Sequence, residues 1–386
     1  MLRDGDGIRQ AAQQVKSEVE KGNRVVVVVS ALKGVTDQLL DATDAIHPNT
    51  PTSVKDHIIR LGEEQSTRLV SSALNLLGVE SEEFTVDSPR WPLITDDNFG
   101  DAEPLLDECQ QAVNLGLKPV IERGVTPVIS GFVGRSISGE VTTLGRGGTD
   151  TTATVLSRCL NADELILVKD VGGVYSADPR RVEGAEMLGA LSTDEAYQLS
   201  SSGAKVLHDK VFRHKNPELG IRLISTGEDL SGSGTLILGG VVEFDLDVSD
   251  APVHEFTLVG EGAISGTSIS GALNCVTECG GKIKSLESNG NNISLLVEGD
   301  PTILLKDLHE LVKGNDLKAV SHKERLHQVT VHGVNFDKVK QGVSRISELP
   351  SVHRVSVSKT QVTLTLESRD HLEKVLTGLG EVISEP

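Results

Sequence analysis

Hydrophobic and polar residues follow two repeating patterns along the first 240 residues, and the two patterns alternate. Apolar residues recur at helical spacing over 6–21, and 24–30 is then a continuous β-branched run, typical of a parallel strand buried on both faces. Later helical patterns lie at 52–77, 101–116, 150–160 and 193–202, and apolar runs at 126–132, 164–169, 221–225 and 235–238. This alternation predicts an α/β sandwich built on a mostly parallel sheet.

The pattern changes over 241–252, which is acidic and has no helical period, so we expect a linker there. Beyond it the order strand, helix, strand, strand, helix, strand occurs twice, over 253–322 and over 323–386. The helices of these repeats are predicted at 266–279, 301–313, 336–348 and 369–378. A lone unit of about 60 residues buries only about 60% of its unfolded surface, so we expect the two sheets to pair. The sequence therefore predicts one domain over 1–240 and two small βαββαβ domains after it.

Composition and charge exclude several classes of protein. Lys and Arg number 37 and Asp and Glu 56, and the net charge of −19 disfavours nucleic acids and anionic membrane surfaces as partners. No apolar run approaches the roughly 20 residues of a membrane-spanning helix, and the first residues carry no secretory signal, so we expect a cytoplasmic protein. The cysteines are too few and too scattered for a disulfide framework or a metal site, and we expect free thiols at Cys109, Cys159, Cys275 and Cys279.

A glycine-rich segment at 143–152 leads directly into a predicted helix. Glycines let successive backbone amides converge, and the helix N-terminus adds about half a positive charge, so the segment is suited to binding an anion. Arg146 is able to grip a carboxylate or phosphate with two hydrogen bonds, and Asp150 to hold an ammonium group or a magnesium ion. The spacing fits neither the dinucleotide fingerprint nor a Walker loop, and from spacing alone a glycine-rich turn with threonine caps is an equal alternative.

Further segments match one known family in the correct order. They lie at 30–36, 61–66, 95–102, 130–134, 143–150, 168–180, 195–208 and 234–237, and include Thr-Leu-Gly-Arg-Gly-Gly-Thr-Asp and Val-Lys-Asp-Val-Gly-Gly-Val-Tyr. Together they resemble the aspartate kinases of the amino acid kinase superfamily over almost all of 8–240. The repeated unit is similar to the paired ACT domains that these kinases carry as amino-acid sensors. The resemblance implies a three-layer sandwich with a mostly parallel sheet, followed by two ferredoxin-like domains.

The resemblance implies that one set of residues contacts L-aspartate. Arg146 would hold the α-carboxylate, Glu63 the ammonium group, and Thr36 with the glycine-rich amides would position the β-carboxylate as nucleophile. The implied substrate set is Ser30, Thr36, Glu63, Phe132, Arg146, Gly147, Thr149 and Asp150, with Arg146 and Asp150 expected to be catalytic.

A second implied set forms the ATP pocket: Lys169, Asp170, Tyr175, Arg180, Lys205 and Val206. Lys205 and Arg180 would neutralise phosphate charge, and Asp170 would accept a hydrogen bond from ribose or adenine. The implied reaction is in-line transfer of the γ-phosphoryl group from Mg²⁺-bound ATP to L-aspartate, with no metal-binding residues of the protein's own. The product is 4-phospho-L-aspartate, in the first step of lysine, threonine and methionine biosynthesis. A carboxylate nucleophile needs neither a strong base nor a covalent intermediate.

These residues also have purely structural interpretations. Phe132 is equally suited to packing the interior, Thr36 to capping the helix that follows it, and Glu63 to a solvated helix face. The Asp-Pro-Arg sequence at 178–180 is turn chemistry on its own. A group of basic residues is expected to be a solvated patch rather than catalytic: His208, Lys210, Arg213, His214 and Lys215.

The sequence departs from the family pattern in several places. These kinases open with a strand carrying Lys-Phe-Gly-Gly-Thr-Ser, whose lysine steadies the transferring group, and the motif is absent here. We expect the sheet to lose an inner strand and phosphoryl transfer to slow by orders of magnitude. Because Arg146 and Asp150 are intact, we expect a truncated aspartate kinase rather than a non-catalytic relative. Lys169, Gly172 and Asp209 stand where relatives commonly have other residues, which alters the nucleotide side of the site.

Two other functions compete with aspartate kinase. One is a regulatory subunit with an inactive kinase domain that binds an amino-acid effector. The other is a superfamily member that acts on acetylglutamate or a nucleoside monophosphate, and the ACT pair argues against it. The loop at 259–267 has open glycine amides suited to an α-carboxylate, with lysine or threonine as effector. The family resemblance also implies a homodimer or tetramer.

Overall fold

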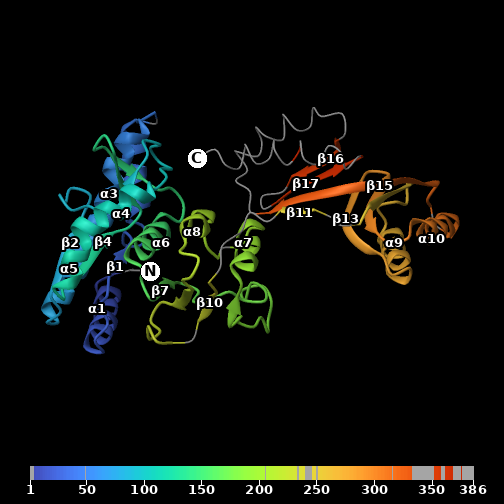
Figure 1. Ribbon diagram of the computed structural model, residues 1–386. Helices are drawn as coiled ribbons and strands as arrows, with labels where there is room; N and C mark the ends of the chain where they lie inside the picture. The colour runs from blue at the N-terminus through green and yellow to red at the C-terminus, as the bar shows by residue number, and fades with distance from the viewer. Residues whose placement is uncertain are drawn as a thin grey trace. The chain divides into compact units, whose positions relative to one another are not determined.

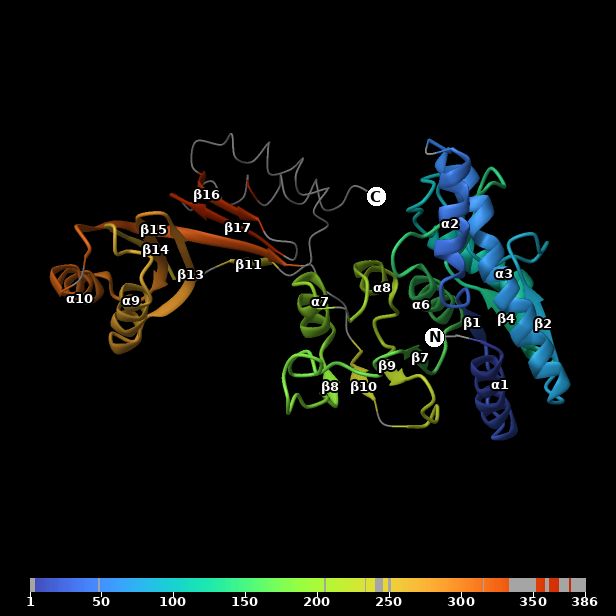
Figure 2. The ribbon, with the colours of Figure 1, turned by 180° about the vertical axis from the view of Figure 1, so that it is seen from behind.

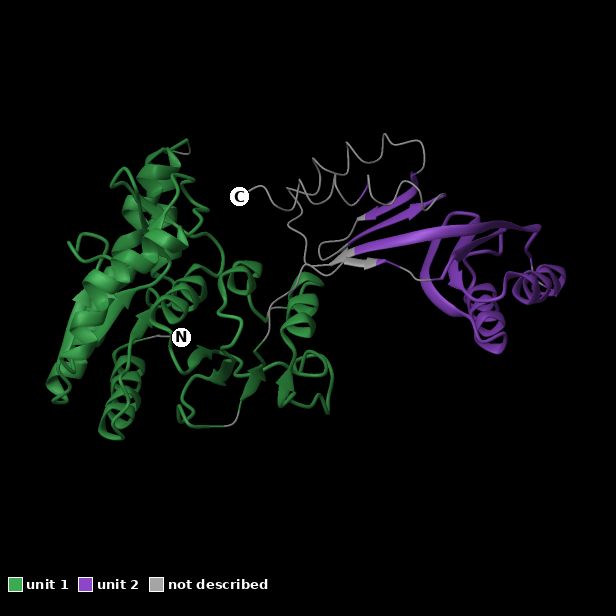
Figure 3. Ribbon diagram, in the orientation of Figure 1, with its two compact units in different colours: residues 1–242 green, residues 243–386 purple. Residues whose placement is uncertain are grey.

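The computed structural model describes residues 4–47, 49–204, 206–232, 234–239, 246–248, 251–314, 316–332, 352–357 and 361–367, together with Val375. The chain divides into two compact units, residues 1–242 and 243–386, shown in two colours in Figure 3. Figure 1 labels the helices and strands of both. Within the described residues, no helix combines the length and the apolar character needed to cross a bilayer.

A parallel three-stranded sheet forms the centre of the first half of unit 1. Its order is β1 (Val27–Val29), β4 (Thr126–Ser130) and β2 (Ser81–Phe84). Helices α1 (Gly5–Glu20) and α3 (Thr52–Leu76) pack on one face, and α6 (Gly148–Leu160) packs on the other (Figure 2). Helix α2 (Val35–Ile46) lies against α3. The expected layering of helices on both faces of a parallel sheet is confirmed.

Alternation along the strands explains why both faces are apolar. Val29 and Val128 point toward α1 and α3, whereas Val28 and Ile129 belong to the cluster that includes α6. The expectation for 24–30 is only partly right: β1 is three residues long, and most of these valines are half-buried. They are half-buried because one edge of β1 borders a cavity rather than another strand.

A second sheet in unit 1 has the order β7-β9-β10-β8. Its strands are β7 (Leu165–Lys169), β9 (Ile221–Ser225), β10 (Thr235–Ile237) and β8 (Ala190–Leu191). Strand β7 runs parallel to β9, and β10 runs antiparallel to it. Helices α7 (Thr193–Ser201) and α8 (Asp209–His214) contribute to its core. Three of the predicted strands and one predicted helix therefore lie where the sequence placed them.

The segment predicted as a helix over 101–116 differs from the expectation. Helix α4 begins only at Leu106 and ends at Ala112, and a π-helical turn η1 (Val113–Leu117) and α5 (Lys118–Glu122) follow it. Residues 101–105 are not helical: Ala102 donates its N–H to the carbonyl of Thr143 at 2.9 Å, and Pro104 forms a bridge with Thr95. A small third sheet explains this contact: β3 (Ile94–Thr95), β5 (Val133–Ser136) and β6 (Val141–Thr143). The sequence patterns did not predict this sheet, β2 or α8. The helix expected at Thr36 is present as α2, but its N-cap is Gly34, so the capping interpretation of Thr36 is wrong.

Unit 2 follows the predicted order of elements. The first repeat runs β12 (Val253–Val259), α9 (Gly266–Glu278), β13 (Lys282–Asn289), β14 (Asn292–Glu298), α10 (Pro301–Gly314) and β15 (Ala319–His332). Strands β16 (Val352–Val357) and β17 (Gln361–Leu366) continue the same sheet, and β11 (Leu246–Val248) pairs with β15. The predicted helices at 336–348 and 369–378 lie outside the described residues. The predicted β-rich character of the chain after residue 252 is confirmed. The expected boundary between the two repeats, at 322/323, falls inside the continuous strand β15.

Candidate active site

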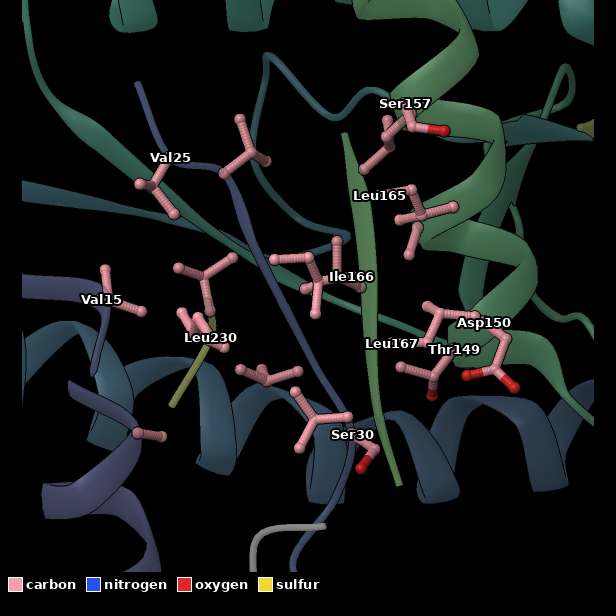
Figure 4. A pocket seen from close by; sticks show the side chains of 18 of the residues that line it. Val15, Val25, Ser30, Thr149, Asp150, Ser157, Leu165, Ile166, Leu167 and Leu230 are labelled. Carbon is pink, nitrogen blue, oxygen red and sulfur yellow. The ribbon is translucent and has the colours of Figure 1, made fainter. Parts of the chain in front are cut away.

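A cavity of about 1130 Å³ in unit 1 lies between β1 and β7 (Figure 4). Among the described strands, β1 pairs with β4 and β7 with β9, and the other edges of β1 and β7 border this cavity. Val25 and Leu165 lie toward one end of the cavity, and Ser30 and Asp150 lie toward the other, which we call the polar end. The carboxyl ends of β1 and β7 therefore bring polar groups to one place, which is where α/β sheets usually bind ligands.

The eight residues predicted to bind aspartate all line this one cavity, although they come from segments far apart in the chain. They are Ser30, Thr36, Glu63, Phe132, Arg146, Gly147, Thr149 and Asp150, and the predicted ATP residues Lys169 and Asp170 line it too. Tyr175, Arg180 and Val206 are not among the lining residues, and Lys205 lies outside the described residues. Arg180 is exposed and donates to Asp178 at 3.1 Å, as the turn interpretation of 178–180 implies.

The glycine-rich segment connects β6 to the N-terminus of α6. Gly145 and Gly147 have φ angles of 70° and 71°, in the left-handed region that side chains rarely adopt. A Cβ on Gly145 would lie 2.4 Å from Oδ1 of Asp101, and one on Gly147 would lie 2.5 Å from Cβ of His208. Only glycine fits at these two positions. We call Gly145–Gly148 the glycine loop, and its path brings the first turn of α6 to the polar end of the cavity. The N–H of Gly148 donates to the carbonyl of Gly145 at 3.1 Å, so the N–H groups of Thr149 and Asp150 are the ones available to a ligand.

Two charged groups flank this helix start. Asp150 is in the first turn of α6, and its Oδ2 accepts a hydrogen bond from Nζ of Lys169, at the end of β7. Arg146 is exposed and lines the cavity. The ammonium group held by Asp150 is therefore that of Lys169, and the two charges balance each other. The charge of Arg146 strengthens the preference of the helix start for anions.

Glu63 is buried in the wall of the cavity, with only 3% of its surface exposed. It accepts a hydrogen bond from the backbone N–H of Ala31, and its Oε2 has no hydrogen-bond partner among the described residues. Burial raises its pKa to about 8, since the one backbone hydrogen bond offsets little of the lost hydration. The solvated-face interpretation of Glu63 is therefore wrong. Glu63 therefore presents to the cavity a buried carboxyl group whose Oε2 has no hydrogen-bond partner among the described residues, which is uncommon for a buried polar atom.

Phe132 packs against the core beneath the parallel sheet, as its structural interpretation implies, and it also lines the cavity. Its φ of 67° is uncommon for a side chain of this size, and such strain is maintained only where surrounding contacts enforce it. The enforcing contacts are a hydrogen bond from its N–H to Oγ1 of Thr152 at 3.1 Å and one from the N–H of Leu144 to its carbonyl at 2.9 Å.

The predicted solvated basic patch is wrong for most of its members. Lys210, His214 and Lys215 are buried, at 2%, 9% and 4% exposure. His214 Nε2 lies 3.1 Å from Oε2 of Glu103, and Arg213 donates to the same carboxylate at 2.9 Å. Burial opposes the ionisation of Glu103, but these partners outweigh it and lower the pKa of Glu103 to about 2. The patch is an internal network that ties α8 to the segment before α4.

A second buried carboxylate on α3 was not singled out from the sequence. Asp56 is 1% exposed and accepts hydrogen bonds from Gly100 N at 2.9 Å, Thr143 N at 3.1 Å and Thr143 Oγ1 at 2.8 Å. Burial raises its pKa, and these hydrogen bonds act in the opposite direction. Asp56 thereby fixes β6 and the 96–101 loop against α3. An Asp at the buried position of an otherwise amphipathic helix is the signal that could have identified it.

The described residues contain no group of three or more His, Cys, Asp or Glu side chains arranged to hold a metal ion. All four cysteines are free thiols, as predicted. Burial raises the pKa of Cys109 to about 12 and that of Cys159 to about 11, so neither is a ready nucleophile. The chemistry of the cavity therefore rests on carboxylates, cationic side chains and backbone amides.

Comparisons with known proteins agree with this geometry. The model of the amino acid kinase family matches residues 1–216. The chain is 35% identical to an aspartokinase of Corynebacterium glutamicum over 263 residues, 67% of this chain and 58% of that protein, so it spans little more than half of that relative. It is 30% identical to an aspartokinase of Bacillus sp. strain MGA3 over 314 residues, 81% of this chain and 72% of that protein.

Two solved structures show the same fold. The aspartate kinase of Synechocystis aligns with a TM-score of 0.75 and 22% identity, over 100% of this chain and 68% of that one. Escherichia coli aspartokinase III, solved in complex with aspartate and ADP, aligns with a TM-score of 0.53 and 23% identity, over 99% of this chain and 97% of that one.

Proposed function

Because the chain belongs to the amino acid kinase family and, within it, to the aspartokinases, we propose that it transfers the γ-phosphoryl group of ATP to the β-carboxylate of L-aspartate. The products are 4-phospho-L-aspartate and ADP. The observation that carries the proposal is one cavity in which Glu63, a buried carboxyl group whose Oε2 has no hydrogen-bond partner among the described residues, lines the same space as the glycine loop. A cation site and an anion site together match an amino acid that carries an ammonium group and two carboxylates.

Each functional group of aspartate has a complementary group in the cavity. The ammonium group would replace the missing partner of Glu63, which favours its charged form and lowers its pKa. Arg146 offers two parallel N–H groups to the α-carboxylate. The amides at the start of α6 and the hydroxyl of Thr36 would hold the β-carboxylate at the polar end of the cavity. The alternative substrates of the superfamily, acetylglutamate and a nucleoside monophosphate, have no free ammonium group for Glu63.

Transfer from ATP requires positioning and charge neutralisation more than acid or base chemistry. The nucleophile is already an anion, so no side chain needs to remove a proton. Lys169, held by Asp150, and the N-terminus of α6 supply positive charge where the transferring group would pass. Mg²⁺ would arrive with the nucleotide and neutralise phosphate charge, because the described residues offer it no cluster of ligands. Asp170 lines the cavity and would contact the nucleoside, with Tyr175, Arg180, Lys205 and Val206 completing the ATP side.

The direct test is ATP-dependent formation of aspartyl hydroxamate by the full chain in the presence of hydroxylamine. We expect activity with L-aspartate, and a loss of about 100-fold in kcat/KM for Arg146→Met with partial recovery in Arg146→Lys. If the folded chain forms no hydroxamate but binds lysine or threonine in calorimetry, the kinase proposal is wrong and the chain is a regulatory subunit.

Unit 2 contains a candidate site for the amino-acid effector. A pocket of about 460 Å³ is lined by Gly262, Ser265, Thr267, Ser268, Lys313, Gly314 and Asp316. It includes part of the predicted 259–267 loop, and Lys313 and Asp316 place both signs of charge around it, as a zwitterion requires. We propose lysine or threonine as the ligand; E. coli aspartokinase III has been solved in complex with lysine and aspartate. A homodimer or tetramer is proposed with it, and light scattering at micromolar concentration checks the assembly.

A further inference from the structure

We propose that Lys210 is a positioning residue that fixes the conformation of the glycine loop from beneath. The inference rests on the proposed function, in which this loop holds the β-carboxylate of aspartate. Lys210 belongs to α8, 66 residues after Leu144 in the chain, and its side chain is only 3% exposed. It does not line the cavity, so any effect on the reaction passes through the loop.

The ammonium group of Lys210 binds four oxygens from two separate segments. Nζ donates to Oδ1 of Asp101 at 2.7 Å, to the carbonyl of Asp101 at 3.2 Å and to the carbonyl of Ala102 at 3.1 Å. It also donates to the carbonyl of Leu144 at 3.1 Å, immediately before the glycine loop. One buried cation therefore joins α8, the 101–102 segment and the base of the loop. A lysine that merely balanced surface charge would not converge on three backbone carbonyls.

The same contact shapes the loop beyond Leu144. Asp101 Oδ1, which Lys210 binds, is the atom that a Cβ on Gly145 would approach to 2.4 Å. His208, two residues before Lys210, occupies the equivalent space beside Gly147, at 2.5 Å. Gly145 is thus packed against Asp101, which Lys210 binds, and Gly147 against His208, two residues before Lys210. With Lys210 in position, the loop has little room to relax away from the conformation that presents its amides.

Contacts that do not need Lys210 also hold its surroundings, which makes its role separable from folding. Glu103, 3.6 Å from Nζ of Lys210, also binds Arg213 and His214 of α8, and Asp56 holds Thr143 from α3. These contacts keep α8 and β6 in place when the ammonium group is removed. The carbonyl of Leu144 would then lose its hydrogen bond, and the loop would shift without the unit unfolding. A shift of about 1 Å in a group that positions a reactant costs about 100-fold in rate.

The test compares Lys210→Met with Lys210→Arg and with Lys215→Met in the full chain. Lys215 is a matched control: it is a second buried lysine, just beyond α8, and it donates to the carbonyl of Asn216 at 3.2 Å. We expect Lys210→Met to lower kcat/KM for aspartate about 100-fold while KM for ATP changes by less than about threefold. We expect Lys210→Arg to recover most of this loss, and Lys215→Met to lower thermal stability but leave both kinetic parameters close to wild type.

Amide hydrogen exchange over 143–149 supplies a readout that needs no activity. Exchange in this segment should be faster in Lys210→Met than in wild type and unchanged in Lys215→Met. If wild-type protein makes no acyl phosphate, the proposed function fails and the exchange comparison still decides the role of Lys210. The positioning role is overturned if exchange over 143–149 is the same in Lys210→Met and wild type, or if the two lysine variants lose activity in proportion to their stability.

Discussion

Helix α3 carries three buried acidic side chains, Asp56, Glu63 and Glu64. Glu64 is paired with Arg60 at 2.8 Å. Asp56 and Glu63 lie about two turns apart, and their surroundings differ in one respect. Both are nearly inaccessible, at 1% and 3% exposure. Asp56 accepts three hydrogen bonds from Gly100 and Thr143, whereas Oε2 of Glu63 has no partner among the described residues.

Burial alone therefore does not distinguish a structural carboxylate from a binding one. The distinguishing quantity is the number of donors that the protein itself provides. Asp56 has enough donors to satisfy its carboxylate within the fold. Ionised Glu63 would be buried at a cost in stability, which a cationic ligand would remove under the proposed function. The comparison identifies Glu63, rather than Asp56, as the carboxyl group on which the proposed function is best tested.

The largest expected effect is on activity when Glu63 loses its charge. Glu63→Gln keeps the shape of the side chain but leaves the substrate ammonium group without a counter-charge, which costs about 3–4 kcal/mol, or several hundred-fold in kcat/KM for aspartate. Hydroxamate kinetics measure it. An unchanged KM and kcat in Glu63→Gln would remove the ammonium-binding role.

The next effect is on stability as a function of pH. Because the folded-state pKa of Glu63 is raised, its protonated form gives stability that is complete below the usual pKa near 4.5 and is lost as the pH rises through about 8. Between pH 6 and pH 9, wild type should lose about 2–3 kcal/mol more than Glu63→Gln. Trp91, the only tryptophan, is buried in unit 1 and reports urea unfolding of that unit by fluorescence. If the free energy of unfolding depends on pH in the same way in wild type and in Glu63→Gln, the raised pKa of Glu63 is contradicted.

A smaller effect is expected on the affinity for aspartate. Below about pH 8 the free site holds a proton on Glu63, and the ammonium group requires the ionised form, so binding releases that proton. The Kd for aspartate should fall by up to about tenfold for each pH unit from 6 toward 8, and be flat in Glu63→Gln. Calorimetry in two buffers of different ionisation enthalpy measures the proton released.

The smallest effect is expected at the other carboxylate. Asp56→Asn keeps an acceptor for the amides of Gly100 and Thr143, and it removes the burial cost of an ionised group whose pKa is already raised. The substitution should lower the free energy of unfolding of unit 1 by only about 1 kcal/mol. A decrease in the free energy of unfolding as large as the one that a buried unpaired charge causes would show that Asp56 is fully ionised and indispensable to the fold.

Local patterns in the sequence predicted many of the helices and strands, and the family resemblance supplied the outline of the site. The helix predicted over 193–202 is present as α7, and the glycine-rich segment does lead into α6. These two features depend on residues close together in the chain. Seven of the eight predicted substrate residues follow a strand or begin a helix beside the cavity, and Glu63 lies in the middle of α3.

The failures share a different cause. Lys210 looks like a solvated lysine between polar neighbours, and its burial depends on carbonyls more than 60 residues away. The segment at 101–105 was predicted to be helical, but a hydrogen bond from the N–H of Ala102 to the carbonyl of Thr143 in β6 is incompatible with that helix. Such contacts between distant segments override local propensity, and no spacing rule reveals them.

The pairing of strand β15 affects how unit 2 unfolds and how it responds to ligands. Its first half pairs with β12 and its second half with β17, so one uninterrupted backbone is shared by strands from both predicted repeats. If β15 separates from β12 or from β17, it loses hydrogen bonds along one half while its other half is still paired. The described strands of unit 2 should therefore open as one cooperative block, and tightening of the pocket beside α9 should slow amide exchange as far away as β17.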